Sequence, residues 1–124
     1  SQAIYSSGDF YEFEISTLQI FGKQIPVSGG GYLRISPWGI MERLIKKYLA
    51  NSTFFTLYIH PFELSYRANP EFPSGTNLKN KIRFSLGRTT VVKKLNSLIA
   101  LLRENGFQFT TFSVLREKMI NEAR

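Results

Sequence analysis

Residues 53–60 read TFFTLYIH and are followed by Pro61. The stretch is β-branched and aromatic, and it has no polar face beyond threonine, which is typical of a strand covered on both sides. It stands between two segments in which apolar residues recur at helical spacing. A covered strand that alternates with helices predicts an α/β fold with some parallel strand pairing.

The two flanking helices have clear end signals. Ser36-Pro37 predicts the start of a helix over residues 37–50, and Thr89 or Thr90 can cap a second helix that ends near Asn105. The apolar stripes consist of Ile40, Met41, Leu44, Ile45, Tyr48 and Leu49 in the first helix and of Val91, Leu95, Leu98, Leu101 and Leu102 in the second. Both are therefore expected to be amphipathic and to pack one face on the core.

Weaker patterns complete the chain. Residues 11–21 alternate as a half-buried strand does, and a short strand is predicted around Ile25. Residues 65–85, rich in proline, asparagine and scattered charges, are predicted to be a long loop. A short strand near residues 107–109 and a helix from about Ser113 give the predicted order β-β-α-β-α-β-α.

The domain organisation is simple. Residues 1–10 are predicted to be a flexible lead-in, and residues 11–124 to form a single domain. Three or four strands make only part of a sheet or barrel, so we expect one edge to stay unpaired unless another segment or molecule covers it. An exposed edge would allow two copies to form a dimer.

The composition excludes several classes of protein. The 124 residues are 43% hydrophobic and 15% aromatic, which is enough to build one globular core. The apolar runs are much shorter than a membrane helix, so no membrane span is expected. The chain has one aspartate, Asp9, one histidine, His60, and no cysteine. Metal sites and catalytic triads need several such groups together, and thiol chemistry needs a cysteine, so these are disfavoured within this chain.

His60 is the first candidate for a functional residue. The predicted strand places it at a C-terminal strand end, where α/β folds collect catalytic groups. Alternation along the strand puts it on the same face as Tyr58. The alternative is a structural histidine whose ring nitrogens bind backbone groups.

A second candidate is the glycine-rich segment of residues 29–34, which ends with Tyr32, Leu33 and Arg34. Glycines let a backbone approach a ligand closely, a tyrosine can stack on a sugar or base, and an arginine can bind an anion. A tight turn with ordinary flanks is the alternative. The segment is not a phosphate-binding loop, because the following helix opens with Ser36-Pro37-Trp38 and not with Gly-Lys-Ser/Thr.

The chain is basic, with 16 Lys and Arg against 9 Asp and Glu and a formal charge of +7. Basic residues next to aromatic ones can bind nucleic acid through phosphate contacts and stacking. On both long helices, however, the basic residues fall mostly opposite the apolar stripes, as on any solvated helix face. We therefore do not expect a nucleic-acid partner, and a basic nucleic-acid-binding module remains the third interpretation.

Five elements in order carry a resemblance to a known family: Glu14–Leu18, Ile25–Val27, Gly29–Arg34 with Ser36-Pro37, Leu57–Glu63 and Arg83–Thr89. Together they resemble the C-terminal segment of bacterial NodB-type polysaccharide deacetylases, and more narrowly their exopolysaccharide-associated branch. The resemblance covers about residues 11–119, and its most specific parts are the patterns Gly-Gly-Gly-Tyr-x-Arg and Tyr-x-His-Pro-x-Glu.

The resemblance implies the C-terminal part of an irregular (β/α) barrel that removes N-acetyl groups from a sugar polymer. In the family, a divalent metal, usually zinc, is held by one Asp and two His from motifs early in the chain. Those motifs do not occur in this sequence. We therefore expect the metal-binding half to lie upstream, no metal ligand or cofactor within these residues, and no activity from this chain alone.

The resemblance also implies roles for single residues. His60 matches the histidine that acts as general acid to the departing amine, and Leu57 matches the leucine that shapes the pocket for the acetate methyl group. Glu63 is expected to orient or charge-stabilise His60, and Tyr32 and Arg34 to bind sugar hydroxyls or the base carboxylate. Trp38 replaces a common tyrosine, so it is assigned to the sugar-binding surface.

The leading hypothesis is thus a hydrolase of carbohydrate metabolism, in which this chain supplies the late part of the active site. Its partners would be an N-acetylated bacterial polysaccharide and the upstream half of the same protein, in the cytoplasm or the cell envelope. The alternative is a non-catalytic carbohydrate-binding or interaction domain of a bacterial envelope protein.

Overall fold

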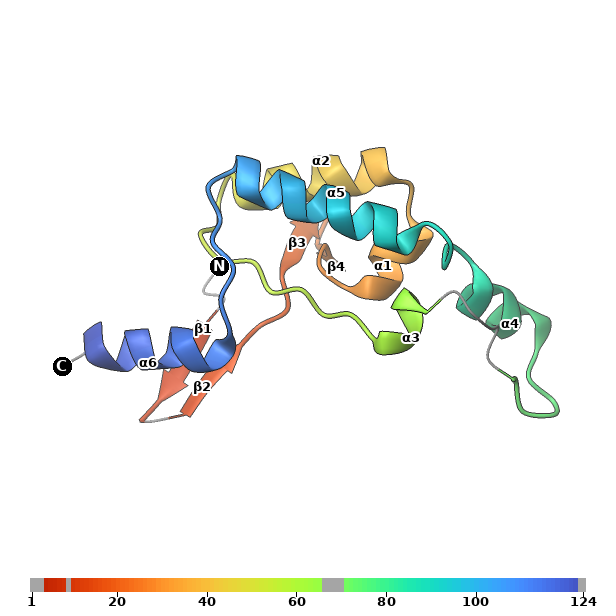
Figure 1. The fold of residues 1–124 in the computed structure, drawn as a ribbon, viewed down its shortest axis with the longest axis horizontal. Helices are drawn as coiled ribbons and strands as arrows, with labels where there is room; N and C mark the ends of the chain where they lie inside the picture. Colours follow the sequence, from red (N-terminus) through yellow and green to blue (C-terminus); the bar gives the residue numbers. More distant parts are fainter. Residues whose placement is uncertain (1–3, 9, 66–70, 123–124) are drawn as a thin grey trace.

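The hydrophobic core lies between two helices, α2 (Trp38–Leu49) and α5 (Val91–Glu104), in a computed structural model that describes residues 4–8, 10–65 and 71–122. Figure 1 shows these helices side by side. The buried cluster consists of Val27, Leu33, Met41, Ile45, Tyr48, Leu98, Leu101 and Leu102. Both helices were predicted from their apolar stripes, and both predictions are confirmed to within a residue or two at each end.

Two hairpins precede the helices. Strand β1 (Ile4–Ser7) pairs antiparallel with β2 (Phe10–Phe13), and β3 (Thr17–Ile20) pairs antiparallel with β4 (Lys23–Pro26). The β3–β4 turn uses positive φ at Phe21 and Gly22, a conformation that suits glycine. The strand predicted around Ile25 is confirmed. The lead-in assigned to residues 1–10 contains β1, while Asp9 and residues 1–3 lie outside the described residues.

The single strand predicted over residues 11–21 is wrong because the chain breaks at Ser16. That residue is buried, and its carbonyl accepts the backbone N–H of Val27 at 3.0 Å. Its hydroxyl accepts the backbone N–H of Thr56 at 2.9 Å. The polar contacts of Ser16 thus join three segments, and β2 and β3 belong to two different two-stranded sheets.

The strand predicted over residues 53–60 is also wrong. The segment is extended, but its only assigned pairing is an isolated parallel bridge between Gly29 and Tyr58. Phe55 and Leu57 pack against the core cluster, so the prediction of burial holds. The residue types of this segment indicate that its side chains suit a covered surface. A β-strand also needs a neighbouring strand to pair with, and none lies beside residues 54–57 in the described structure.

Three helices were not predicted: α1 (Gly30–Ile35), α3 (Pro61–Leu64) and α4 (Leu78–Ser85). Helix α1 is built on glycines, which are poor helix formers, and α3 is a single turn. Helix α4 lies in the predicted loop, where the Asn77 side chain caps it by accepting the N–H of Asn80 at 2.9 Å. No strand is assigned at residues 107–109.

The C-terminal helix α6 (Phe112–Glu122) begins next to the predicted Ser113, so this prediction is confirmed. It packs on the first hairpin, where the rings of Phe13 and Phe112 stack with centroids 4.8 Å apart, to one side of the core helices (Figure 1). The described chain is therefore a mixed α/β structure with antiparallel strand pairs. Parallel pairing in the described residues is limited to the isolated bridge between Gly29 and Tyr58, and the predicted order of elements is wrong. None of the described helices is long and apolar enough to cross a membrane.

Candidate functional site

His60 precedes the short helix α3 and is held at its N-terminal end. Pro61 starts the helix, where its missing N–H costs nothing and its fixed φ is suitable. The Glu63 side chain turns back, so that its Oε2 accepts the backbone N–H of His60 at 3.0 Å. Because this carboxylate is only 2% exposed, it fixes the backbone of His60 from inside the protein.

The imidazole of His60 has a different neighbour at each ring nitrogen. Nδ1 lies 3.8 Å from Glu63 Oε2, too far for a hydrogen bond but close enough for a charge interaction. Nε2 lies 2.8 Å from the hydroxyl of Tyr58. The ring stands edge to face on Tyr58, with centroids 4.7 Å apart, and its side chain is 50% exposed. His60 is thus held by the protein but open to solvent.

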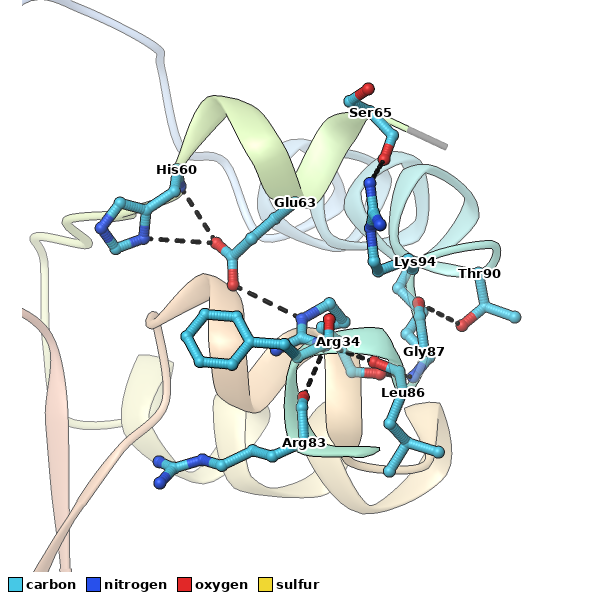
Figure 2. A network of polar contacts seen from close by, with 11 residues as sticks. Arg34, His60, Glu63, Ser65, Arg83, Leu86, Gly87, Thr90 and Lys94 are labelled. Carbon is cyan, nitrogen blue, oxygen red and sulfur yellow. Dashed lines mark hydrogen bonds and ion pairs between the residues drawn. The ribbon is translucent and has the colours of Figure 1, made fainter. Parts of the chain in front are cut away.

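Arg34 lies behind Glu63 and ties it to a distant part of the chain. Its Nε is 3.6 Å from Glu63 Oε1, and its Nη1 donates to the carbonyls of Arg83, Phe84 and Leu86 at 3.0, 3.0 and 2.5 Å. Figure 2 shows the carboxylate of Glu63 between the imidazole of His60 and the guanidinium of Arg34. Arg34 is only 4% exposed, and its contacts link the carbonyls at the end of α4 to the carboxylate of Glu63.

Two glycines leave the space that this pair occupies. A Cβ on Gly30 would overlap Glu63 Oε2 and come within 2.9 Å of Glu63 Cδ and of Ile59 Cγ1. A Cβ on Gly87, which has φ +76°, would overlap the carbonyl oxygen of Arg34. These close approaches explain why glycine stands at both positions.

A lysine supports the same region from α5. Lys94 Nζ donates to the carbonyls of Arg34 and Ser36 at 2.8 and 2.7 Å, at the C-terminal end of α1. Burial of the ammonium group lowers the pKa of Lys94 from its usual 10.5. Nearby, the guanidinium of Arg88 donates to the carbonyl of Ser65 just after α3. Basic side chains on and before α5 therefore bind the backbone that carries the site.

The structure brings three of the predicted site residues together and separates the others. Glu63 lies between His60 and Arg34 and contacts both. The contacts described for Arg34 are to Glu63 and to backbone carbonyls of the same chain. Tyr32 is 48% exposed on α1, whereas Leu57 and Trp38 pack against the core. Leu57 also lines an apolar cavity of about 980 Å³ between residues 49–57 and 98–115, of which His60 is not a lining residue.

Sequence reasoning missed Tyr58 as a member of the site. The alternation that put it on the face of His60 was the available signal, and the contact between their side chains confirms that placement. The roles of Gly30, Gly87 and Lys94 were also missed, because they arise from contacts between residues far apart in the sequence. No local pattern reports such contacts.

Chemically, the arrangement presents an exposed imidazole backed by a buried carboxylate and a buried guanidinium. An imidazole can give or take a proton near neutral pH, and a fixed carboxylate orients the ring. The donor set does not fit a metal site: no group of three or more His, Cys, Asp or Glu residues occurs among the residues that the structure describes. The site is suited to proton transfer.

Comparison with known proteins gave one result. The model of a family described as domain of unknown function (DUF3473) matches residues 1–116. Neither curated proteins nor solved structures gave a match. Since the matched region spans nearly all of the 124 residues, the chain belongs to this family, which is associated with the C-terminal part of polysaccharide deacetylases.

Proposed function

We propose that this chain is the C-terminal part of a metal-dependent polysaccharide deacetylase that hydrolyses N-acetyl groups of a bacterial exopolysaccharide. The observation that carries the proposal is the half-exposed imidazole of His60, held by the buried carboxylate of Glu63. The association of the family with the C-terminal part of such enzymes supports it independently.

His60 would act as the general acid. When an amide is hydrolysed, the C–N bond breaks and its electron pair stays on nitrogen, so the amine leaves readily only if it receives a proton. A protonated imidazole is a suitable donor near neutral pH, and such proton transfer contributes roughly 100- to 10,000-fold to rates. Exposure of the ring lets a polymer reach it, and Glu63 fixes the backbone that carries the ring.

The remainder of the active site would come from an upstream half of the protein. The described residues offer no metal site, so the divalent metal, which would polarise the acetyl carbonyl and activate water, would be bound by residues outside them. In this proposal the two halves together complete an irregular (β/α) barrel. Leu57 would shape the acetate pocket, with Tyr32 and Trp38 on the sugar-binding surface.

The direct test is His60→Ala in the full-length protein, assayed on an N-acetylated oligosaccharide. We expect kcat to fall by about 100-fold or more, because the leaving amine would have to take its proton from water. Zinc content, measured by elemental analysis, should stay unchanged, and the exposed Lys46→Ala on α2 serves as a matched control. Unchanged turnover of His60→Ala would rule out the general-acid assignment.

A second candidate, a non-catalytic carbohydrate-binding domain, is favoured by a strip of exposed rings. Tyr58, His60, Phe62 and Phe84 follow one another with centroids 4.7, 5.5 and 6.0 Å apart, and we call them the aromatic strip. Aromatic side chains of this kind can stack on sugar rings. Oligosaccharide binding by the isolated chain, lost in Phe84→Ala, together with an inactive full-length protein, would favour this candidate.

A further inference from the structure

The hydroxyl of Tyr58 contacts Nε2 of His60, the nitrogen through which His60 would deliver a proton. The hydroxyl oxygen lies 2.8 Å from Nε2, and Nδ1 points to the buried Glu63. Nε2 is therefore hydrogen-bonded to the protein, while Nδ1 faces a carboxylate that lies beyond hydrogen-bond distance. From this geometry we infer that Tyr58 is the proton relay between His60 and the departing amine, an inference that rests on the proposed function.

The contacts favour one ring nitrogen as the carrier of the proton in the neutral form. Oε2 of Glu63 already accepts the backbone N–H of His60, so it faces the ring as an acceptor, and at 3.8 Å it acts on Nδ1 through charge. A proton on Nδ1 leaves the lone pair on Nε2. In this assignment the Tyr58 hydroxyl donates to Nε2, and neutral His60 would be the Nδ1–H tautomer.

Tyr58 is fixed at one end and accessible at the other. Its backbone N–H donates to Ser28 at 3.0 Å, and its carbonyl accepts the N–H of Gly30 at 2.7 Å, which makes it the one paired residue of the extended segment 54–60. Its side chain is 50% exposed. A relay needs this combination, because its oxygen must keep contact with the imidazole while it also reaches the substrate.

The proton transfer balances as follows. Protonated His60 donates its Nε2 proton to the oxygen of Tyr58, while the hydroxyl proton of Tyr58 passes to the amine nitrogen. The C–N bond breaks in the same step, and its electron pair stays on nitrogen. Afterwards Tyr58 is again a neutral phenol and His60 is neutral with its proton on Nδ1, so two protons move for each amine released.

The first test uses the isolated chain, in which His60 is the only histidine. Imidazole nitrogen shifts in the NMR spectrum report the tautomer without interference from other rings. We expect Nδ1–H in the wild type and a shift toward Nε2–H in Tyr58→Phe, which keeps the ring and removes the hydroxyl. Tyr5→Phe, at another half-exposed tyrosine on β1, is the matched control. An Nε2–H wild type, or no change in Tyr58→Phe, overturns the assignment.

The second test uses the full-length protein. Tyr58→Phe should lower kcat by about tenfold with KM unchanged, because His60 must then donate its proton directly to the amine, without the bridging hydroxyl. Rates in mixtures of light and heavy water should follow a curved dependence in the wild type and a linear one in Tyr58→Phe, as two moving protons become one. A merely structural role would leave the curvature in place.

The outcomes separate the relay from the proposed function. Full activity of His60→Ala overturns the general acid and the relay with it. The relay alone is overturned if His60→Ala is inactive while Tyr58→Phe keeps an unchanged kcat and a curved isotope dependence. A slowed, linear Tyr58→Phe beside an inactive His60→Ala supports both.

Discussion

Oε1 of Glu63 lies 3.6 Å from Nε of Arg34, and both side chains are almost fully buried. The pair joins the turn that holds His60 to the end of α4, through the backbone carbonyls that Arg34 also binds. A buried ion pair is costly to desolvate, so removal of one partner costs far more than removal of both. The position of His60 therefore depends on a contact between residues that are distant in the sequence.

Removal of Arg34 should destabilise the protein strongly. Arg34→Met leaves the Glu63 carboxylate buried without a cation, so we expect a loss of about 3–5 kcal/mol in the free energy of unfolding, measured with urea. Arg34→Met with Glu63→Leu should recover part of the loss, since the lone charge is gone. As a control, Glu42→Gln breaks the exposed pair between Glu42 and Lys46 on α2. A loss in Arg34→Met no larger than in this control would contradict the prediction.

A methyl group at Gly30 should act on the same pair. Gly30→Ala forces the Glu63 carboxylate to move, so we expect a loss of about 1–3 kcal/mol in unfolding free energy. Gly39→Ala is the matched control, because it also lies in a helix but its Cβ would meet open space. That variant should gain up to about 1 kcal/mol from helix propensity. Equal effects in urea unfolding would refute the assigned role of Gly30.

Gly87 allows a comparison at constant backbone strain. Gly87 and Gly106 have φ of +76° and +80°, so alanine is strained at both. Only at Gly87 would its Cβ also overlap the carbonyl oxygen of Arg34. We therefore expect Gly87→Ala to lower the thermal midpoint of unfolding clearly more than Gly106→Ala, as measured by calorimetry. The reverse order would show that the close approach to Arg34 is unimportant.

Lys94 should make stability depend on pH in the alkaline range. Burial lowers the pKa of Lys94 in the folded state. Between the folded-state pKa and the unfolded-state pKa of about 10.5, the unfolded chain therefore binds more protons than the folded one, so the free energy of unfolding rises with pH across this window. We expect the stability of the wild type relative to Lys94→Met to rise as pH approaches about 10.5, as followed by urea unfolding. Exposed Lys93→Met controls for the loss of one positive charge. A relative stability that falls with pH would contradict the assigned shift.

The candidate site could be predicted from sequence only in part. The strand pattern singled out His60, the glycine-rich segment singled out Arg34, and the family resemblance added Glu63; the structure brings all three together. The sequence could not show that Arg34 is buried against the end of α4, because that depends on how the chain packs over residues 34–86. Nor could it show that Leu57 and Trp38 pack on the core, since apolar residues suit a ligand surface and a core equally.

The sequence by itself determined the amphipathic helices α2 and α5, because their apolar residues recur with the local period of 3.6 residues that burial of one helix face follows. It also determined that His60 is the single imidazole available to any site. The tertiary structure alone decided that residues 54–57 form no strand, because a strand exists only where a second segment pairs with it. It alone decided that the buried guanidinium of Arg34 meets the Glu63 carboxylate behind His60, because that contact joins segments whose distance in space no local pattern records.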